Sequence, residues 1–96
     1  MAENNPQINV RATDEDLKVK YVNHIAMMVT KEEFVLDCLS IFGPQGSVIS
    51  RIALSPGHAK RLHNLLTEQI KQYEDTYGAI SVAEESPRKI GFANKE

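Results

Sequence analysis

The spacing of apolar residues changes at Ser55-Pro56 from every second position to every third or fourth position. Ser47–Leu54 alternates in the period-two pattern of a β-strand. The residues that follow form the apolar stripe of an amphipathic helix: Ala59, Leu62, Leu66, Ile70, Tyr73 and Tyr77. Ser55 offers an N-cap hydroxyl, Pro56 suits the first helical position, and Gly78 suits the position after the last. The pattern therefore predicts a strand that leads directly into a helix of about 22 residues.

Strand patterns also precede this point. Leu17–Val29 has apolar residues at most odd positions, which predicts a strand, and Asn23 interrupts them. We therefore expect a bend or bulge at Asn23, or two shorter strands. Apart from Asp37 and Ser40, Phe34–Phe42 is apolar, aromatic and β-branched, as suits a central strand that is covered on both faces. Ile8 and Val10 are candidates for the start of a short edge strand.

Polar and glycine-rich stretches between these segments predict turns. Thr13–Asp16 is a cluster of short polar residues that bond their own backbone. Thr30–Glu33 matches a capping box, but strand-like sequence resumes at once, so we interpret it as a single turn that links two strands. Gly43–Gly46 reverses the chain, because proline presets one turn torsion and glycine accepts positive φ.

The order of these segments predicts an α+β fold, an antiparallel β-meander of three to four strands packed by one long C-terminal α-helix. A chain of 96 residues suits one domain, which we place at 8–80. We expect residues 1–7 to be disordered and residues 81–96 to form a flexible tail. Ala79–Val82 is a candidate for weak strand pairing. Ile90 and Phe92 are either a short binding motif or inert.

Composition excludes several classes of protein. The chain is 42% hydrophobic and 25% charged, as soluble globular proteins are, and no apolar run approaches the roughly 18 residues of a membrane span. The N-terminus lacks a basic region followed by an apolar one, so we expect no secretory signal and a cytoplasmic location. A net charge of −2 disfavours a protein that coats DNA.

Residues with catalytic or metal-binding chemistry are few and scattered. The chain has one cysteine, Cys38, which we expect to be a small buried hydrophobe. His58 and His63 lie about 140° apart around a helix, so they do not form an i, i+4 ligand pair. Asp37 lies in an apolar strand, where a cation or a backbone N–H is its expected partner. We therefore predict no enzyme activity, no cofactor and no metal site.

The start of the predicted helix has the opposite charge to the one that the helix dipole favours. His58, Lys60 and Arg61 lie there, and no carboxylate follows until Glu68. Free N–H groups and the dipole attract anions to a helix start, so these residues predict an anion-binding or partner-binding surface, to which Arg51 can add. The alternative is that Lys60 and Arg61 are long, solvated side chains beyond the strongest part of the helix dipole, and that His58 only packs or caps.

The central strand also predicts association. One helix covers one face of a small sheet, whereas Phe34–Phe42 is apolar on both faces. Met27 and Met28 are adaptable side chains that suit such an interface. We therefore expect a homodimer with Met27 and Met28 at its contact.

Spaced residues over Tyr21–Ile80 resemble a family of short bacterial and archaeal proteins of unknown function. The matching blocks are Tyr21-x-Asn23, Phe34-x-Leu36-Asp37, Arg51-Ile52-x-Leu54-Ser55-Pro56-x-His58-Ala59-Lys60 and Tyr73-Glu74-x-x-Tyr77-Gly78-x-Ile80. The family brings no established activity. Some relatives are encoded next to the large subunits of RNA polymerase, so the resemblance implies a transcription-linked partner. Hence the leading hypothesis is a non-enzymatic interaction module that contacts RNA polymerase. The alternative is a nucleic-acid-binding homodimer that uses the basic helix start.

Overall fold

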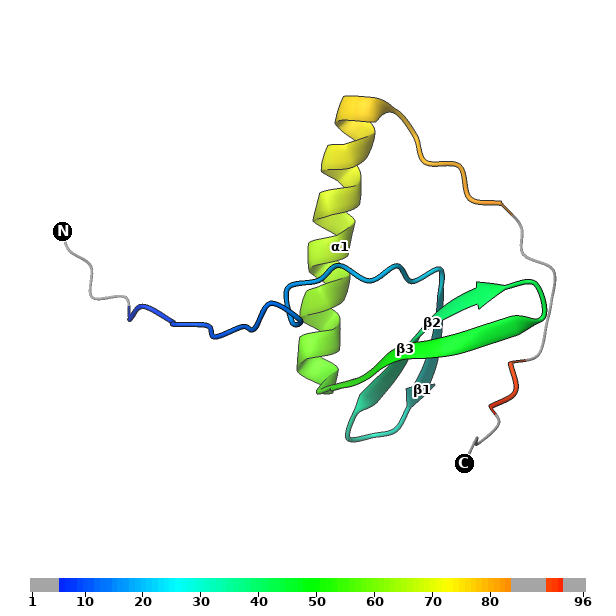
Figure 1. The fold of residues 1–96 in the computed structure, drawn as a ribbon. Coiled ribbons are helices and arrows are strands. Elements are labelled where there is room, and N and C mark those ends of the chain that lie inside the picture. Colours follow the sequence, from blue (N-terminus) through cyan, green and yellow to red (C-terminus); the bar gives the residue numbers. More distant parts are fainter. Residues whose placement is uncertain (1–5, 84–89, 93–96) are drawn as a thin grey trace. The chain divides into compact units, whose positions relative to one another are not determined.

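The computed structural model describes residues 6–83 and 90–92. Its elements follow in the order β1 (His24–Val29), β2 (Phe34–Phe42), β3 (Gln45–Leu54) and α1 (Pro56–Tyr77) (Figure 1). The chain divides into two compact units, Met1–Ala59 and Lys60–Glu96. The first unit therefore holds the sheet and the first turn of α1, and the second holds the rest of the helix.

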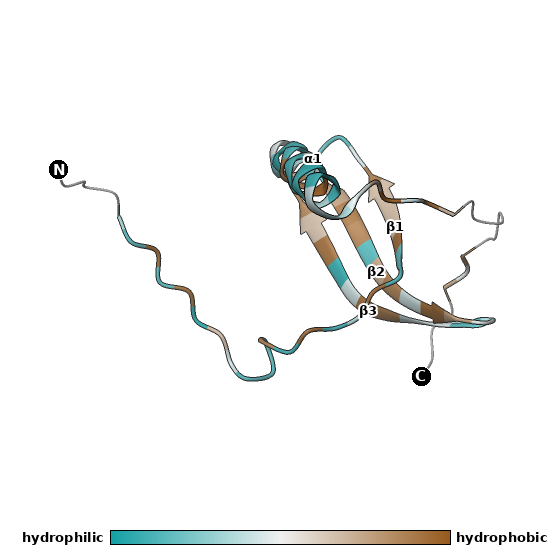
Figure 2. Ribbon diagram, turned by 90° about the horizontal axis from the view of Figure 1, so that it is seen from above, coloured by the Kyte–Doolittle hydropathy of each residue, from teal (hydrophilic) through white to brown (hydrophobic). Residues whose placement is uncertain are grey.

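The sheet is an antiparallel meander of order β1-β2-β3, so β2 is its central strand, as predicted (Figure 2). Gly43 and Pro44 form the loop between β2 and β3, because Phe42 pairs with Gln45. Gly43 has a φ of 63°, which the first central position of a type II′ turn requires. The predicted turn at Thr30–Glu33 is confirmed, since the Thr30 hydroxyl accepts hydrogen bonds from the N–H groups of Glu32 and Glu33 at 3.2 and 3.1 Å.

β1 is shorter than the predicted strand Leu17–Val29, because its partner strand, β2, ends at Phe42. In the β1–β2 register, in which His24 pairs with Leu39, residues before Tyr21 would lie beyond the end of β2. The Asn23 side chain continues the pairing instead. Its Nδ2 donates to the Ile41 carbonyl and its Oδ1 accepts from the Ile41 N–H, each at 2.9 Å. Asn23 thus marks the start of the strand.

Strand alternation gives the sheet one largely apolar face, on which Ser50 pairs with Cys38, and one mixed face. The apolar face carries Ile25, Met27, Val29, Phe34, Leu36, Cys38, Ile52 and Leu54. The mixed face carries Leu39 and Asp37, the only described residues that are buried. Between Cys38 and Leu39 the β2–β3 register shifts, so that Ile49 is an extra residue on β3 and forms a β-bulge.

Helix α1 begins and ends where the capping signals predict. The Ser55 hydroxyl accepts a hydrogen bond from the His58 N–H at 3.1 Å. At the other end, Gly78 has a φ of 104° and its N–H donates to the Glu74 carbonyl at 2.9 Å. The Glu74 carboxylate accepts a further bond from the Ile80 N–H. The Tyr73 and Tyr77 rings, one turn apart, have centroids 4.9 Å apart.

The predicted fold class is therefore confirmed, with three strands in the described part of the chain. The candidate edge strand at Ile8 and Val10 and the candidate pairing of Ala79–Val82 are not formed, since neither segment is a strand. The turn at Thr13–Asp16 is confirmed by two reciprocal hydrogen bonds between Thr13 and Asp16. The expected disordered N-terminus, 1–7, and tail, 81–96, lie partly outside the described residues.

Candidate functional site

The predicted anion site at the start of α1 offers few free backbone donors. Pro56 has no N–H, the Ser55 hydroxyl binds the N–H of His58, and the Ala59 N–H donates to the Ser55 carbonyl at 2.9 Å. Of the first helical residues, only Gly57 has an N–H without a hydrogen bond to the described part of the chain. An anion at this helix end would therefore depend on cationic side chains more than on the backbone.

The cationic side chains of this helix start point in different directions. Consecutive residues are about 100° apart around a helix, so Lys60 and Arg61 diverge, whereas His58 and Arg61 lie on the same side, one turn apart. His58, Lys60 and Arg61 are all exposed, and no acidic residue lies in the first turn. Within residues 6–83 and 90–92, neither Lys60 nor Arg61 forms an ion pair. Both charges are therefore available to a partner.

Arg51, the fourth residue of the predicted site, binds Asp37. Its Nη2 donates to Oδ2 of Asp37 at 3.1 Å and its Nε donates to Oδ1, a two-point contact across β2 and β3. The prediction that Asp37 has a structural cation partner is confirmed. The side chain of Asp37 is 9% exposed and that of Arg51 is 58% exposed. The positive charge of Arg51 is thus largely offset, although the group still reaches the surface.

The two-point contact also fixes the protonation of the pair. The hydrogen bond from Arg51 lowers the pKa of the Asp37 carboxyl below its usual value, and burial opposes this shift. The same hydrogen bond raises the pKa of Arg51. Asp37 is therefore an ionised structural residue near neutral pH and not a proton donor.

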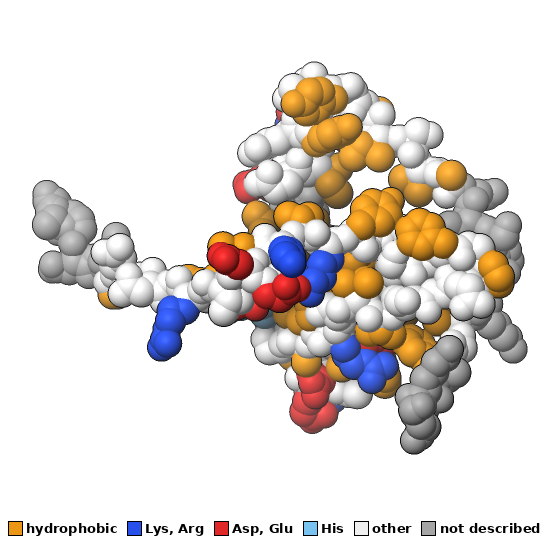
Figure 3. Space-filling view, in the orientation of Figure 1, with side chains coloured by type: hydrophobic (Ala, Val, Ile, Leu, Met, Phe, Trp, Pro, Cys, Tyr) orange, Lys and Arg blue, Asp and Glu red, His pale blue; other side chains and the backbone are white. Residues whose placement is uncertain are grey.

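The predicted dimer contact, Met27 and Met28, lies on the edge strand β1. Successive strand residues face opposite ways, so Met27 belongs to the apolar face and Met28 to the mixed face. Met27 is 55% exposed and Met28 is 57% exposed. Cys38 shares the apolar face with Met27 and is half-buried, so the prediction that it is buried is only partly right. Figure 3 shows hydrophobic side chains at the surface of the protein.

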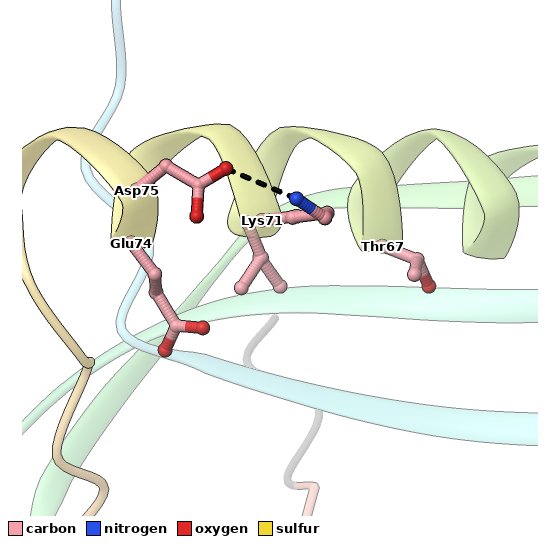
Figure 4. Close-up of a pocket in the computed structure, with 5 residues that line it drawn as sticks. Thr67, Lys71, Glu74 and Asp75 are labelled. Atoms are coloured by element: carbon pink, nitrogen blue, oxygen red, sulfur yellow. Dashed lines mark hydrogen bonds and ion pairs between the residues drawn. The ribbon is translucent and has the colours of Figure 1, made fainter.

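A depression on α1 adds residues that the sequence did not single out. Its walls are Thr67, Ile70, Lys71, Glu74 and Asp75, all on one helix (Figure 4). Lys71 donates to Asp75 at 3.0 Å, and the Glu74 carboxylate accepts from the Ile80 N–H, so all three charged groups have a hydrogen-bond partner. In the sequence, the i, i+4 spacing of Lys71 and Asp75 on a helix is the feature that could have predicted this ion pair. A single helix does not enclose a ligand, and we assign no ligand to this depression.

The described residues hold neither a metal-binding cluster nor a membrane-spanning helix. No group of three or more His, Cys, Asp and Glu side chains is placed there to hold a metal ion. His63 Nδ1 contacts Oδ1 of its neighbour Asn64 at 3.2 Å, which is a local surface bond. None of the helices in the described part of the chain has the length and apolar character that crossing a membrane requires.

Comparison with known proteins gives one match. Residues 1–82 match the model of a family described as "Protein of unknown function (DUF3467)". No curated protein and no solved structure matches the chain.

Proposed function

The chain belongs to the DUF3467 family, whose function is unknown, and we propose that it acts as a non-enzymatic module that binds an acidic surface of a protein partner. The observation that supports this function most is the pair of exposed cations at the start of α1, Lys60 and Arg61, without a carboxylate in the first turn. Lys60 and Arg61 lie in the second turn of α1, where the helix dipole is weaker, so the support comes from their exposed positive charges, which an acidic surface would attract.

The partner that we propose is RNA polymerase, in the cytoplasm, with the protein acting as a transcription-linked accessory factor. The support is the gene neighbourhood of similar proteins, together with the exposed basic helix start. We propose further that the protein acts as a homodimer, for which the support is the exposure of Met27 and Met28 on an edge strand.

Affinity capture from a native lysate tests the partner contact. The wild-type chain should recover polymerase subunits, and the double variant Lys60→Glu with Arg61→Glu should lose most of this recovery. The matched control is Lys71→Glu, which changes a lysine on the same helix that is already paired with Asp75. Equal recovery by all three chains would contradict the proposed contact.

Direct nucleic-acid binding is the alternative outcome, and salt distinguishes it. Neutralising phosphates releases counterions, so affinity for duplex DNA would fall steeply with added salt. The divergence of Lys60 and Arg61 and the net charge of −2 weigh against this alternative. Binding of the purified chain to a DNA duplex at low salt, lost in the double variant, would replace the protein partner with nucleic acid.

A further inference from the structure

Strand β1 is an edge strand whose outer side is open to another strand. It pairs with β2 on one side only, and no backbone hydrogen bond from the described residues reaches its other side. An edge of this kind presents unpaired N–H and C=O groups, which a further strand can bind.

β1 lacks the features that usually protect an edge strand. Its sequence, HIAMMV, has no lysine, carboxylate, proline or glycine, and its register with β2 has no bulge. The opposite edge, β3, differs on both counts, because it carries Arg51 and the bulge at Ile49. Of the two edges, β1 is therefore the one suited to strand addition.

Apart from His24 at its start, the side chains of β1 are apolar on both faces of the sheet. Ile25, Met27 and Val29 face one side and are about half exposed, while Ala26 and Met28 face the other. A strand that joins this edge must therefore present apolar side chains on both of its faces. A second copy of β1 meets this requirement.

Charges beyond the two ends of β1 favour an antiparallel second copy. Lys18 and Lys20 precede the strand, and Lys31, Glu32 and Glu33, with a net charge of −1, follow it. All five are exposed, Lys18 is paired with Glu15, and Lys20, Glu32 and Glu33 form no ion pair in the described part of the chain. In an antiparallel pair, the basic start of each β1 lies beside the acidic end of the other, and two-fold symmetry repeats the attraction.

We propose that two copies of this chain dimerise by antiparallel pairing of β1 with β1, which joins their sheets into one six-stranded sheet. A two-fold axis at Met27 places Met27 opposite its own copy and Ile25 opposite Val29 of the other copy. This surface rests on the proposed homodimer, and it uses neither of the residues of the proposed partner contact, Lys60 and Arg61, which belong to the other unit.

Sedimentation equilibrium of the full chain, at about 100 μM, tests the surface. The wild-type protein should have twice the monomer mass of 10.8 kDa. Met27→Lys places two lysines opposite each other at the two-fold axis, and their repulsion should raise the dissociation constant of the dimer at least about tenfold. Val48→Lys, a half-exposed valine on the other edge strand, is the matched control and should remain dimeric. A monomeric wild type would overturn the homodimer, and a dimeric Met27→Lys would overturn only the β1 surface.

A charge swap at exposed positions should leave the fold intact, so any change in dimerisation cannot be explained by unfolding. Lys20→Glu should weaken the dimer about tenfold, because it turns both end attractions into repulsions. Adding Glu32→Lys to it should restore the wild-type constant. Failure of the second change to rescue the first would count against the antiparallel arrangement.

Disulfide trapping tests the position of the axis. Residues directly opposite in an antiparallel pair bring their Cβ atoms within about 5 Å, near the reach of a disulfide. On a Cys38→Ser background, Met27→Cys should give a covalent dimer on oxidation and Val48→Cys should not. The opposite result, or a covalent dimer from neither variant, would overturn the proposed pairing. The latter is also the result expected if β1 pairs with a strand of another protein instead.

Discussion

The Asn23 side chain should protect the start of β1, and removing it should loosen one identifiable amide. It forms two hydrogen bonds of 2.9 Å with the backbone of Ile41, one as donor and one as acceptor. Each neutral hydrogen bond contributes about 0.5–1.5 kcal/mol, and these two are exposed, so Asn23→Ala should cost about 1–2 kcal/mol. That free energy corresponds to about 5- to 30-fold faster hydrogen exchange of the Ile41 N–H.

Native-state hydrogen exchange measures this loss at the Ile41 amide. Asn64→Ala is the control, because Asn64 is an exposed asparagine on α1 that contacts its neighbour His63, and it should leave Ile41 unchanged. Asn23→Asp keeps the acceptor for the Ile41 N–H but replaces the donor, so its stability deficit should shrink as the pH falls below about 4 and the carboxyl is protonated. Unchanged exchange of Ile41 in Asn23→Ala would refute the role of the side chain.

Three further predictions concern stability. Leu39→Ala should cost about 2–4 kcal/mol in urea unfolding, because Leu39 is the buried hydrophobic residue of the described chain. Gly78→Ala should cost about 1 kcal/mol in thermal unfolding, whereas Gly57→Ala should not destabilise: an added Cβ meets no atom within 4 Å at either position, and only Gly78 has a positive φ. The lowered pKa of Asp37 stabilises the fold above the ordinary aspartate pKa of about 3.9, and this contribution is lost as the pH falls through the lower folded value. Acid titration of Asp37→Asn should therefore show a flatter loss of stability than the wild type.

The helix could be predicted closely because its signals are local. Ser55, Pro56 and Gly78 act through the backbone within one turn of their own positions, and the apolar stripe has a clear period. The turns at Thr30–Glu33 and Gly43–Pro44 were predictable for the same reason. Capping and turn chemistry thus needs no knowledge of distant residues.

Strand lengths and the partner of Arg51 could not be predicted, because both depend on register. Alternation continues back through Leu17–Lys20, but β2 ends at Phe42 and leaves no strand for these residues to join. Counting back from the pair Phe42–Gln45 places Asp37 opposite Ser50. The bulge at Ile49 shifts the register by one, and Asp37 meets Arg51 instead. The ion pair therefore exists because of one extra residue that no local pattern indicates.

The exposed cations of the helix start could be identified from the sequence, but their arrangement could not be stated fully. Arg51 was grouped with them by its closeness along the chain, whereas it is paired with Asp37. Lys60 and Arg61 keep the proposed role because both are exposed and neither has an ion-pair partner in the described residues.

Affinity of the purified chain for purified RNA polymerase, measured by titration calorimetry at moderate salt, tests the proposed partner most directly. The account predicts saturable binding that weakens at least about tenfold in the variant Lys60→Glu with Arg61→Glu, since two charge contacts become repulsive. Lys71→Glu should bind as the wild type does. Absence of binding by the wild-type chain, or equal affinity of the double variant, would contradict it.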